Sequence, residues 1–109
     1  MSDFGAIITF KKSGSSLSDS DRDSILKNFN KIVEDGEYSS HIKSRSSYKF
    51  NKLDGVDCIK LTEYYEDEDA DEIREFAEEE DIYEANEIID SLKAVTDSSI
   101  EMEARFLDW

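Results

Sequence analysis

Apolar and polar positions change their spacing several times along the chain, and each change marks an expected element. Residues 4–10 (FGAIITF) are apolar on both parities, which predicts a strand at the centre of a sheet. Ser18 precedes three aspartates within five positions, a pattern typical of a helix start. The next apolar residues recur at helical spacing and predict a helix that ends at Gly36: Ile25, Leu26, Phe29, Ile32 and Val33.

Alternation and turn residues predict three further strands in the rest of the chain. The Asp54-Gly55 pair predicts a hairpin that joins a strand at about 46–53 to one at about 56–65. The first strand is rich in lysine, which is typical of a sheet edge, and the second is more apolar and more central. Apolar and charged residues alternate over 99–107, which predicts a half-buried final strand.

Helical spacing returns after residue 69, but in two stripes that are out of phase. The first stripe contains Ile73, Phe76 and Ala77, and the second contains Ile82, Ala85, Ile88, Ile89 and Leu92. At about 100° per residue, nine residues place Ile82 opposite Ile73 on a helix. We therefore predict a break near residues 79–81 and two helices in place of one.

The predicted order of elements is β-α-β-β-α(α)-β in one α+β domain that spans residues 1–109. This order is that of a ferredoxin-like, split βαβ arrangement, with an antiparallel four-stranded sheet and its helices on one face. The first and third strands would then lie in the middle, where their apolar character fits. No motif in the chain is specific to a known family.

The distribution of charge is the feature of the sequence that is most informative about function. The chain has 109 residues with 28 acids against 13 bases, for a net charge of −15. Residues 63–90 hold 15 of the acids and a single base, Arg74, so nearly the whole excess lies on one segment. On a helix, like charges four residues apart each cost about 0.2–0.5 kcal/mol. The segment is therefore a solvated face that aids solubility or a surface that binds a basic partner; salt adaptation is disfavoured, because it would spread the acids over the whole chain.

Our first hypothesis is a non-enzymatic protein that neutralises or regulates a basic protein, in the manner of an immunity protein or antitoxin. Electrostatic steering would bring the partner in, and Tyr64 or Tyr65 would anchor it. The alternatives are a DNA mimic that inhibits a DNA-binding protein, and a small dimeric ferredoxin-like enzyme or ligand-binding domain. The predicted partner-binding residues are Tyr64, Tyr65, Glu66, Asp67, Glu68, Asp69, Asp71, Glu72, Glu75, Glu78, Glu79, Glu80, Asp81 and Tyr83.

The sequence has few other residues that indicate catalysis or the binding of a metal, cofactor or nucleic acid. His41 is the only histidine, so it cannot build a zinc site by itself, and we predict no catalytic residue, metal or cofactor. The only basic patch follows residue 42 (Lys43, Arg45, Lys49, Lys52 and Lys60), and at this net charge we expect no direct binding of nucleic acid. A lone cysteine, Cys58, and the lack of a signal or membrane-spanning pattern predict a cytoplasmic protein. Ile7 and Thr9 lie on the open sheet face, where a homodimer could form.

Overall fold

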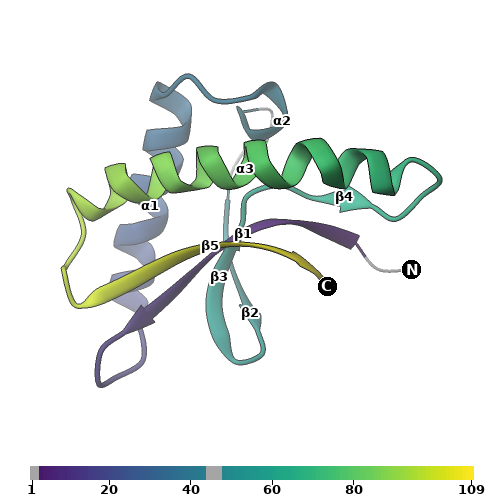
Figure 1. Ribbon diagram of the computed structural model, residues 1–109. Coiled ribbons are helices and arrows are strands. Elements are labelled where there is room, and N and C mark those ends of the chain that lie inside the picture. Colours follow the sequence, from purple (N-terminus) through teal and green to yellow (C-terminus); the bar gives the residue numbers. More distant parts are fainter. Residues whose placement is uncertain (1–2, 44–47) are drawn as a thin grey trace.

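The computed structural model describes residues 3–43 and 48–109, apart from the side chain of His41. Within them the protein is α+β, with an antiparallel sheet of five strands, two long helices and one short helix (Figure 1). The predicted class is confirmed, whereas the predicted count of four strands is wrong by one. The elements are β1 (Asp3–Lys12), α1 (Asp19–Asp35), α2 (Ser40–Lys43), β2 (Phe50–Leu53), β3 (Val56–Lys60), β4 (Tyr64–Tyr65), α3 (Ala70–Lys93) and β5 (Ile100–Asp108).

The first strand, β1, is central, as its apolar character predicts. It pairs with β5 over nine positions, from Phe4 opposite Asp108 to Lys12 opposite Ile100. On its other edge it pairs first with β3 and then, at Asp3 and Phe4, with β4. In the described residues β2 pairs only with β3, consistent with the edge strand predicted there. The predicted start of that strand at residue 46 and the basic residue Arg45 lie outside the described residues.

The strand predicted over residues 56–65 is divided into β3 and β4 by a bulge against β1. The backbone N–H groups of Leu61 and Thr62 both donate to the Ala6 carbonyl, at 2.9 and 3.3 Å. Leu61 and Thr62 on one strand thus oppose the single residue Ala6 on β1, which is the definition of a β-bulge. The Ala6 N–H donates to the Thr62 hydroxyl at 2.9 Å. Gly5 permits this close approach, because a Cβ atom at that position would lie 2.2 Å from the Thr62 carbonyl oxygen.

The start of α1 and the hairpin turn form at the predicted residues, through interactions between residues close in sequence. The Ser18 hydroxyl accepts from the Asp21 N–H and the Asp21 carboxylate accepts from the Ser18 N–H, both at 3.0 Å, which forms a capping box. Asp54 and Gly55 both have positive φ, at 51° and 78°, as a two-residue hairpin turn requires. Along β5 the apolar residues are the more buried ones and the charged residues are exposed, which confirms the predicted alternation.

α3 is one continuous helix, so the predicted break near residues 79–81 is wrong. Ile73 and Ile82 do lie on opposite sides of the helix, but both are only partly buried and they flank a third stripe. That stripe is buried along the whole helix and consists of Ala70, Ala77, Asp81, Ala85, Ile88, Ile89 and Leu92. At about 100° per residue these positions fall in one sector, so a single helix buries them all.

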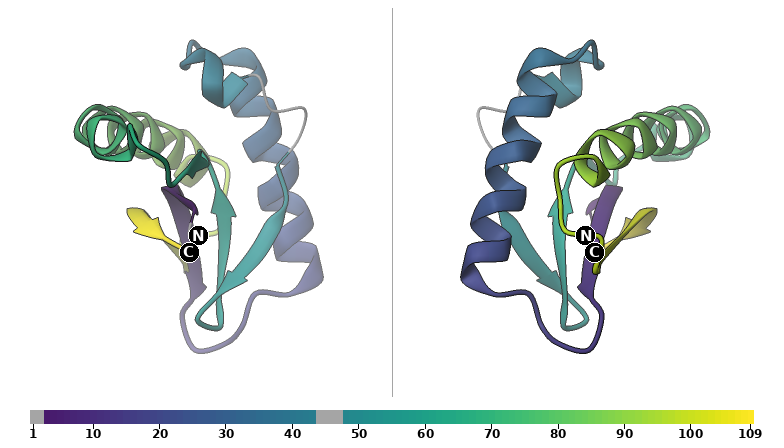
Figure 2. Two further views of the ribbon diagram at one scale, coloured as in Figure 1. Left: turned by 90° about the vertical axis from the view of Figure 1, so that its right-hand side faces the viewer. Right: turned by 90° about the vertical axis from the view of Figure 1, so that its left-hand side faces the viewer.

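The core lies between the sheet and the two long helices. Ala6, Ile8 and Phe10 of β1 pack in one cluster with Phe29 of α1 and Ile88 of α3. The two helices also contact each other (Figure 2). In the described residues, no helix combines the length and the apolar character needed to cross a membrane. The fold therefore buries one side of α3 and presents the opposite side outward.

Candidate functional site

Two of the predicted partner-binding residues point inward and hold α3 to the sheet. Asp81 is fully buried and accepts a hydrogen bond of 2.7 Å from the Tyr64 hydroxyl. The Tyr64 ring packs on Phe4, with ring centroids 5.5 Å apart. Burial first, and then the Asp81 carboxylate, raise the pKa of Tyr64 far above its ordinary value. Asp81 is thus part of the interior; of the two predicted anchors, Tyr64 is half-buried with its hydroxyl directed at Asp81, whereas Tyr65 is exposed.

Arg74, the single base of the acidic segment, is engaged within the chain. Its guanidinium donates to Glu66 at 3.0 Å and to Asp108 at 2.7 Å. Its Cζ atom also lies 4.1 Å from the centroid of the Phe4 ring. Arg74 therefore joins the start of α3 to the end of β5, and it is not available to neutralise the outer face of the helix.

The remaining acids of the segment form a strongly negative surface. Among the described residues, most of its carboxylates are exposed and have no salt-bridge partner within 4.0 Å. These predicted residues are Asp67, Glu68, Asp69, Asp71, Glu72, Glu75, Glu78, Glu79 and Glu80. Glu84 differs, because it accepts from the Ser39 N–H and hydroxyl at 2.7–2.9 Å and so fastens the chain before α2. The free carboxylates thus lie on the outside of α3 and of the loop before it.

Two exposed aromatic side chains lie among these carboxylates. Phe76 is 74% exposed and Tyr83 is 65% exposed. With Glu75, Glu79 and Glu80 they line a shallow groove of about 340 Å³ on α3. We call these five residues the outer groove. Seven residues at about 100° each return to almost the same side of a helix, so both rings lie on the face opposite the buried stripe.

The sequence analysis placed Phe76 in one apolar stripe with Ile73 and Ala77, whereas the structure buries Ala77 and exposes the Phe76 ring. A signal for its exposure was present in the spacing, because Phe76 and Tyr83 are seven residues apart and share a face with Glu72 and Glu79. Tyr65 is 68% exposed, but it lies on β4 and does not line the outer groove. The structure therefore brings together one predicted tyrosine, three predicted glutamates and one phenylalanine that the sequence analysis missed.

Elsewhere on the surface, cations meet carboxylates of the same chain. Lys52 pairs with Asp57 at 3.1 Å, and Arg22 approaches the same carboxylate at 3.7 Å. Lys12 pairs with Asp21 at 3.0 Å. Part of the predicted basic patch is thus neutralised internally, which leaves the outside of α3 as the dominant electrostatic feature.

The open sheet face, where we predicted a homodimer, is partly covered by the chain itself. Ile7 and Thr9 are only 0% and 7% exposed. A Cβ atom on Gly5 would lie 3.1 Å from the indole of Trp109, so this ring packs against the strand. The ammonium group of Lys60 lies 4.5 Å from the centroid of the same indole ring. The homodimer stays a prediction. Ile7 is already buried within one chain, so its side chain would add no apolar surface to a dimer interface.

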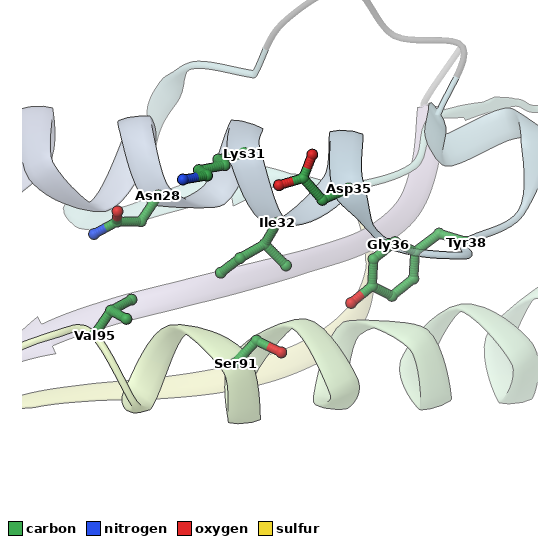
Figure 3. Close-up of a pocket in the computed structure, with 8 residues that line it drawn as sticks. All are labelled: Asn28, Lys31, Ile32, Asp35, Gly36, Tyr38, Ser91 and Val95. Carbon is green, nitrogen blue, oxygen red and sulfur yellow. The ribbon is translucent and has the colours of Figure 1, made fainter.

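A second groove, of about 410 Å³, separates the ends of α1 and α3 (Figure 3). Tyr38 lies at one end of this groove, opposite Ser91 of α3, and Val95 lies at the other end. Burial, and then the nearby carboxylates of Glu87 and Glu84, raise the pKa of Tyr38 above its ordinary value. The groove also has Lys31 and Asp35 among its lining residues.

Over the part of the chain that the structure describes, no group of three or more histidine, cysteine or acidic side chains is arranged to hold a metal ion. Comparison with protein families, with curated proteins and with solved structures finds no match to this chain. The site must therefore be interpreted from its own geometry, which consists of exposed carboxylates around two exposed aromatic rings on one helix face.

Proposed function

We propose that this protein binds a basic protein partner through the outside of α3, without catalysing a reaction. In this proposal it neutralises or regulates that partner, as an immunity protein or antitoxin does. Long-range attraction between the acidic face and the basic partner would accelerate their encounter, and contacts at the outer groove would then hold the complex.

The observation that carries the proposal is the uneven distribution of free charge. Within residues 3–43 and 48–109, the exposed acids of residues 67–80 have no salt-bridge partner, because Arg74 is bound to Glu66 and Asp108. Such a surface is costly for the isolated chain, since neighbouring carboxylates on a helix repel each other by about 0.2–0.5 kcal/mol per pair. A basic partner would remove this repulsion on binding.

The test is capture of partners from cells of the source organism with the immobilised protein, eluted by a salt gradient and identified by mass spectrometry. A variant with Glu72, Glu79 and Glu80 replaced by glutamine is compared with a control variant that carries Glu34→Gln, Glu101→Gln and Glu103→Gln. Both variants lose the same charge at exposed positions, but only the first changes the outside of α3.

One basic protein that is retained in stoichiometric amount by the native chain and the control, but released early from the α3 variant, would support the proposal. A diffuse set of basic proteins lost at about 0.2 M salt would indicate bulk charge only. Equal weakening in both variants would also contradict a specific role for α3.

A second candidate, a DNA mimic, is favoured by the charge spacing on α3. The helix carries eight exposed carboxylates over 24 residues. At 1.5 Å per residue this is about one charge per 4–5 Å, close to the spacing of about 3.4 Å along one DNA strand. The capture experiment separates the two candidates, because a mimic would retain a DNA-binding protein that added duplex DNA displaces.

We also propose that the sheet is a variant of the ferredoxin-like arrangement, in which the predicted third strand is interrupted. The antiparallel pairings of β1 with β3 and β5, and of β2 with β3, support this arrangement. In it, β4 would be the continuation of β3 after the bulge at Leu61 and Thr62. An amide-to-amide nuclear Overhauser contact between Thr9 and Glu103, together with an α-proton-to-α-proton contact between Thr9 and Cys58, would test the central position of β1.

A further inference from the structure

The outer groove has a geometry that favours one kind of cationic side chain. Phe76 and Tyr83 are separated by two helical turns, which is about 10 Å along the axis. Glu79 and Glu80 lie between the two rings, and Glu75 lies beside the first. Among the described residues none of these three glutamates has a salt-bridge partner. Each ring is thus an open apolar surface with free carboxylates next to it.

A guanidinium group matches this combination better than an ammonium group. The guanidinium of arginine is planar, weakly hydrated and able to stack on an aromatic ring while it donates two hydrogen bonds to a carboxylate. The ammonium group of lysine is compact and strongly hydrated, and it interacts as a point charge. A purely acidic surface would attract both residues, so the aromatic rings supply the preference.

The same chain already binds a guanidinium in this way. Arg74 lies with its Cζ atom 4.1 Å from the Phe4 ring centroid and donates to two carboxylates, Glu66 and Asp108. One ring and two carboxylates of the same chain therefore contact one guanidinium at the surface. The outer groove presents the same three groups, with Glu79 and Glu80 beside an exposed ring, but without the cation.

We propose that the outer groove receives arginine side chains of the basic partner, with two guanidinium groups about 10 Å apart stacked on Phe76 and Tyr83. This inference rests on the proposed function and specifies its partner, which would present paired arginines at the contact. Lysine at those positions would preserve the electrostatic attraction but lose the stacking on the two rings.

The experiment uses two synthetic 12-residue peptides, identical except that one carries four arginines and the other four lysines at the same positions. Fluorescence anisotropy measures their binding to the full-length protein at several salt concentrations. Cation–π contacts at exposed sites predict that the arginine peptide binds roughly 5- to 10-fold more tightly. In the double variant Phe76→Leu with Tyr83→Leu, which keeps the net charge, we expect the two peptides to bind equally.

The matched control is Tyr65→Leu, which removes an equally exposed aromatic ring outside the groove. It should retain the preference for arginine, and circular dichroism would verify that all variants keep the native helix content. Equal affinity for the two peptides in the native chain, or a preference that survives the double variant, would overturn the arginine inference and leave the proposed function standing. Failure of both peptides to bind even at low salt would overturn the two proposals together.

Discussion

The two long helices of this protein differ in how they are held. α1 begins with a reciprocal capping box and carries five acids and three bases, so its ends and its surface are stabilised locally. α3 has ten acids and two bases, and its N-cap residue, Asp69, makes no side-chain cap hydrogen bond. Both helices depend on burial against the core, but the first also has local stabilisation at its start that the second lacks, and the second relies more on inward polar contacts.

This difference separates residues that maintain the fold from residues that are free for recognition. On α3 the inward contacts are Arg74 to Asp108 and Asp81 to Tyr64, both between residues distant in sequence. The outward residues, including Phe76 and Tyr83, have no such structural partners among the described residues. A surface that costs stability, and that has no ion pair or ring contact in the part of the chain that the structure describes, is the part we propose for binding to another molecule.

The sharpest test of the comparison replaces one phenylalanine on each helix. Phe29 of α1 is fully buried, whereas Phe76 of α3 is 74% exposed. We expect Phe29→Ala to lower the free energy of unfolding by about 3–5 kcal/mol, because it leaves a cavity in the core. Phe76→Ala should change it by less than about 0.5 kcal/mol. Urea unfolding followed by circular dichroism measures both; a large loss for Phe76→Ala would show that the outer groove contributes to the fold.

A smaller effect is expected from the two N-caps. Ser18→Ala removes the hydroxyl that accepts from the Asp21 N–H, and should cost about 1 kcal/mol. Asp69→Ala removes no cap hydrogen bond, so only the charge near the positive end of the helix is lost, at about 0.5 kcal/mol or less. Chemical denaturation of both variants tests whether Ser18→Ala lowers the free energy of unfolding more than Asp69→Ala does. Equal losses would mean that the two helices start with comparable local stabilisation.

The smallest effect is a pH dependence at the start of α1. The Ser18 N–H, followed by the Lys12 ammonium group, lowers the pKa of Asp21 from 3.8 to about 2. Because the folded pKa lies below the unfolded one, this stabilisation is complete above the unfolded pKa and is lost as the pH falls towards 2. We expect Asp21→Asn to be less stable than the native chain at pH 6, and the difference to become much smaller at pH 2. Denaturation at both pH values tests this; a difference that persists unchanged at pH 2 would contradict it.

The elements that the sequence predicts correctly are those with short-range signals. The cap at Ser18, the turn at Asp54 and Gly55, and the alternation along β5 depend on residues within a few positions of each other. The division of β3 from β4 could not be predicted in this way, because it depends on Leu61 and Thr62 meeting a single residue of β1. Such a contact joins segments more than fifty residues apart.

The sequence indicates where the acidic residues lie along the chain, but not which of them the structure exposes. The excess of acids locates the surface on residues 63–90, but composition does not tell which side of the helix they occupy. Asp81 is buried because Tyr64, seventeen residues earlier, reaches its carboxylate. Phe76 is exposed because alanines at 70, 77 and 85, with Asp81, fill the inner stripe beside the sheet. Hydrophobicity alone assigns a phenylalanine to the core and an aspartate to the surface, and both assignments are reversed here.

The pairing of β1 with β5 determines how the molecule would respond to mechanical force. Asp3 and Trp109 exchange backbone hydrogen bonds of 2.8 and 3.2 Å, so both ends of the described chain lie at the same end of this strand pair (Figure 1). Ladder bonds between antiparallel strands run perpendicular to the strands. A force that pulls residues 3 and 109 apart therefore acts on these hydrogen bonds one at a time. The β1–β5 pair would separate at low force, beginning at the end where Asp3 pairs with Trp109.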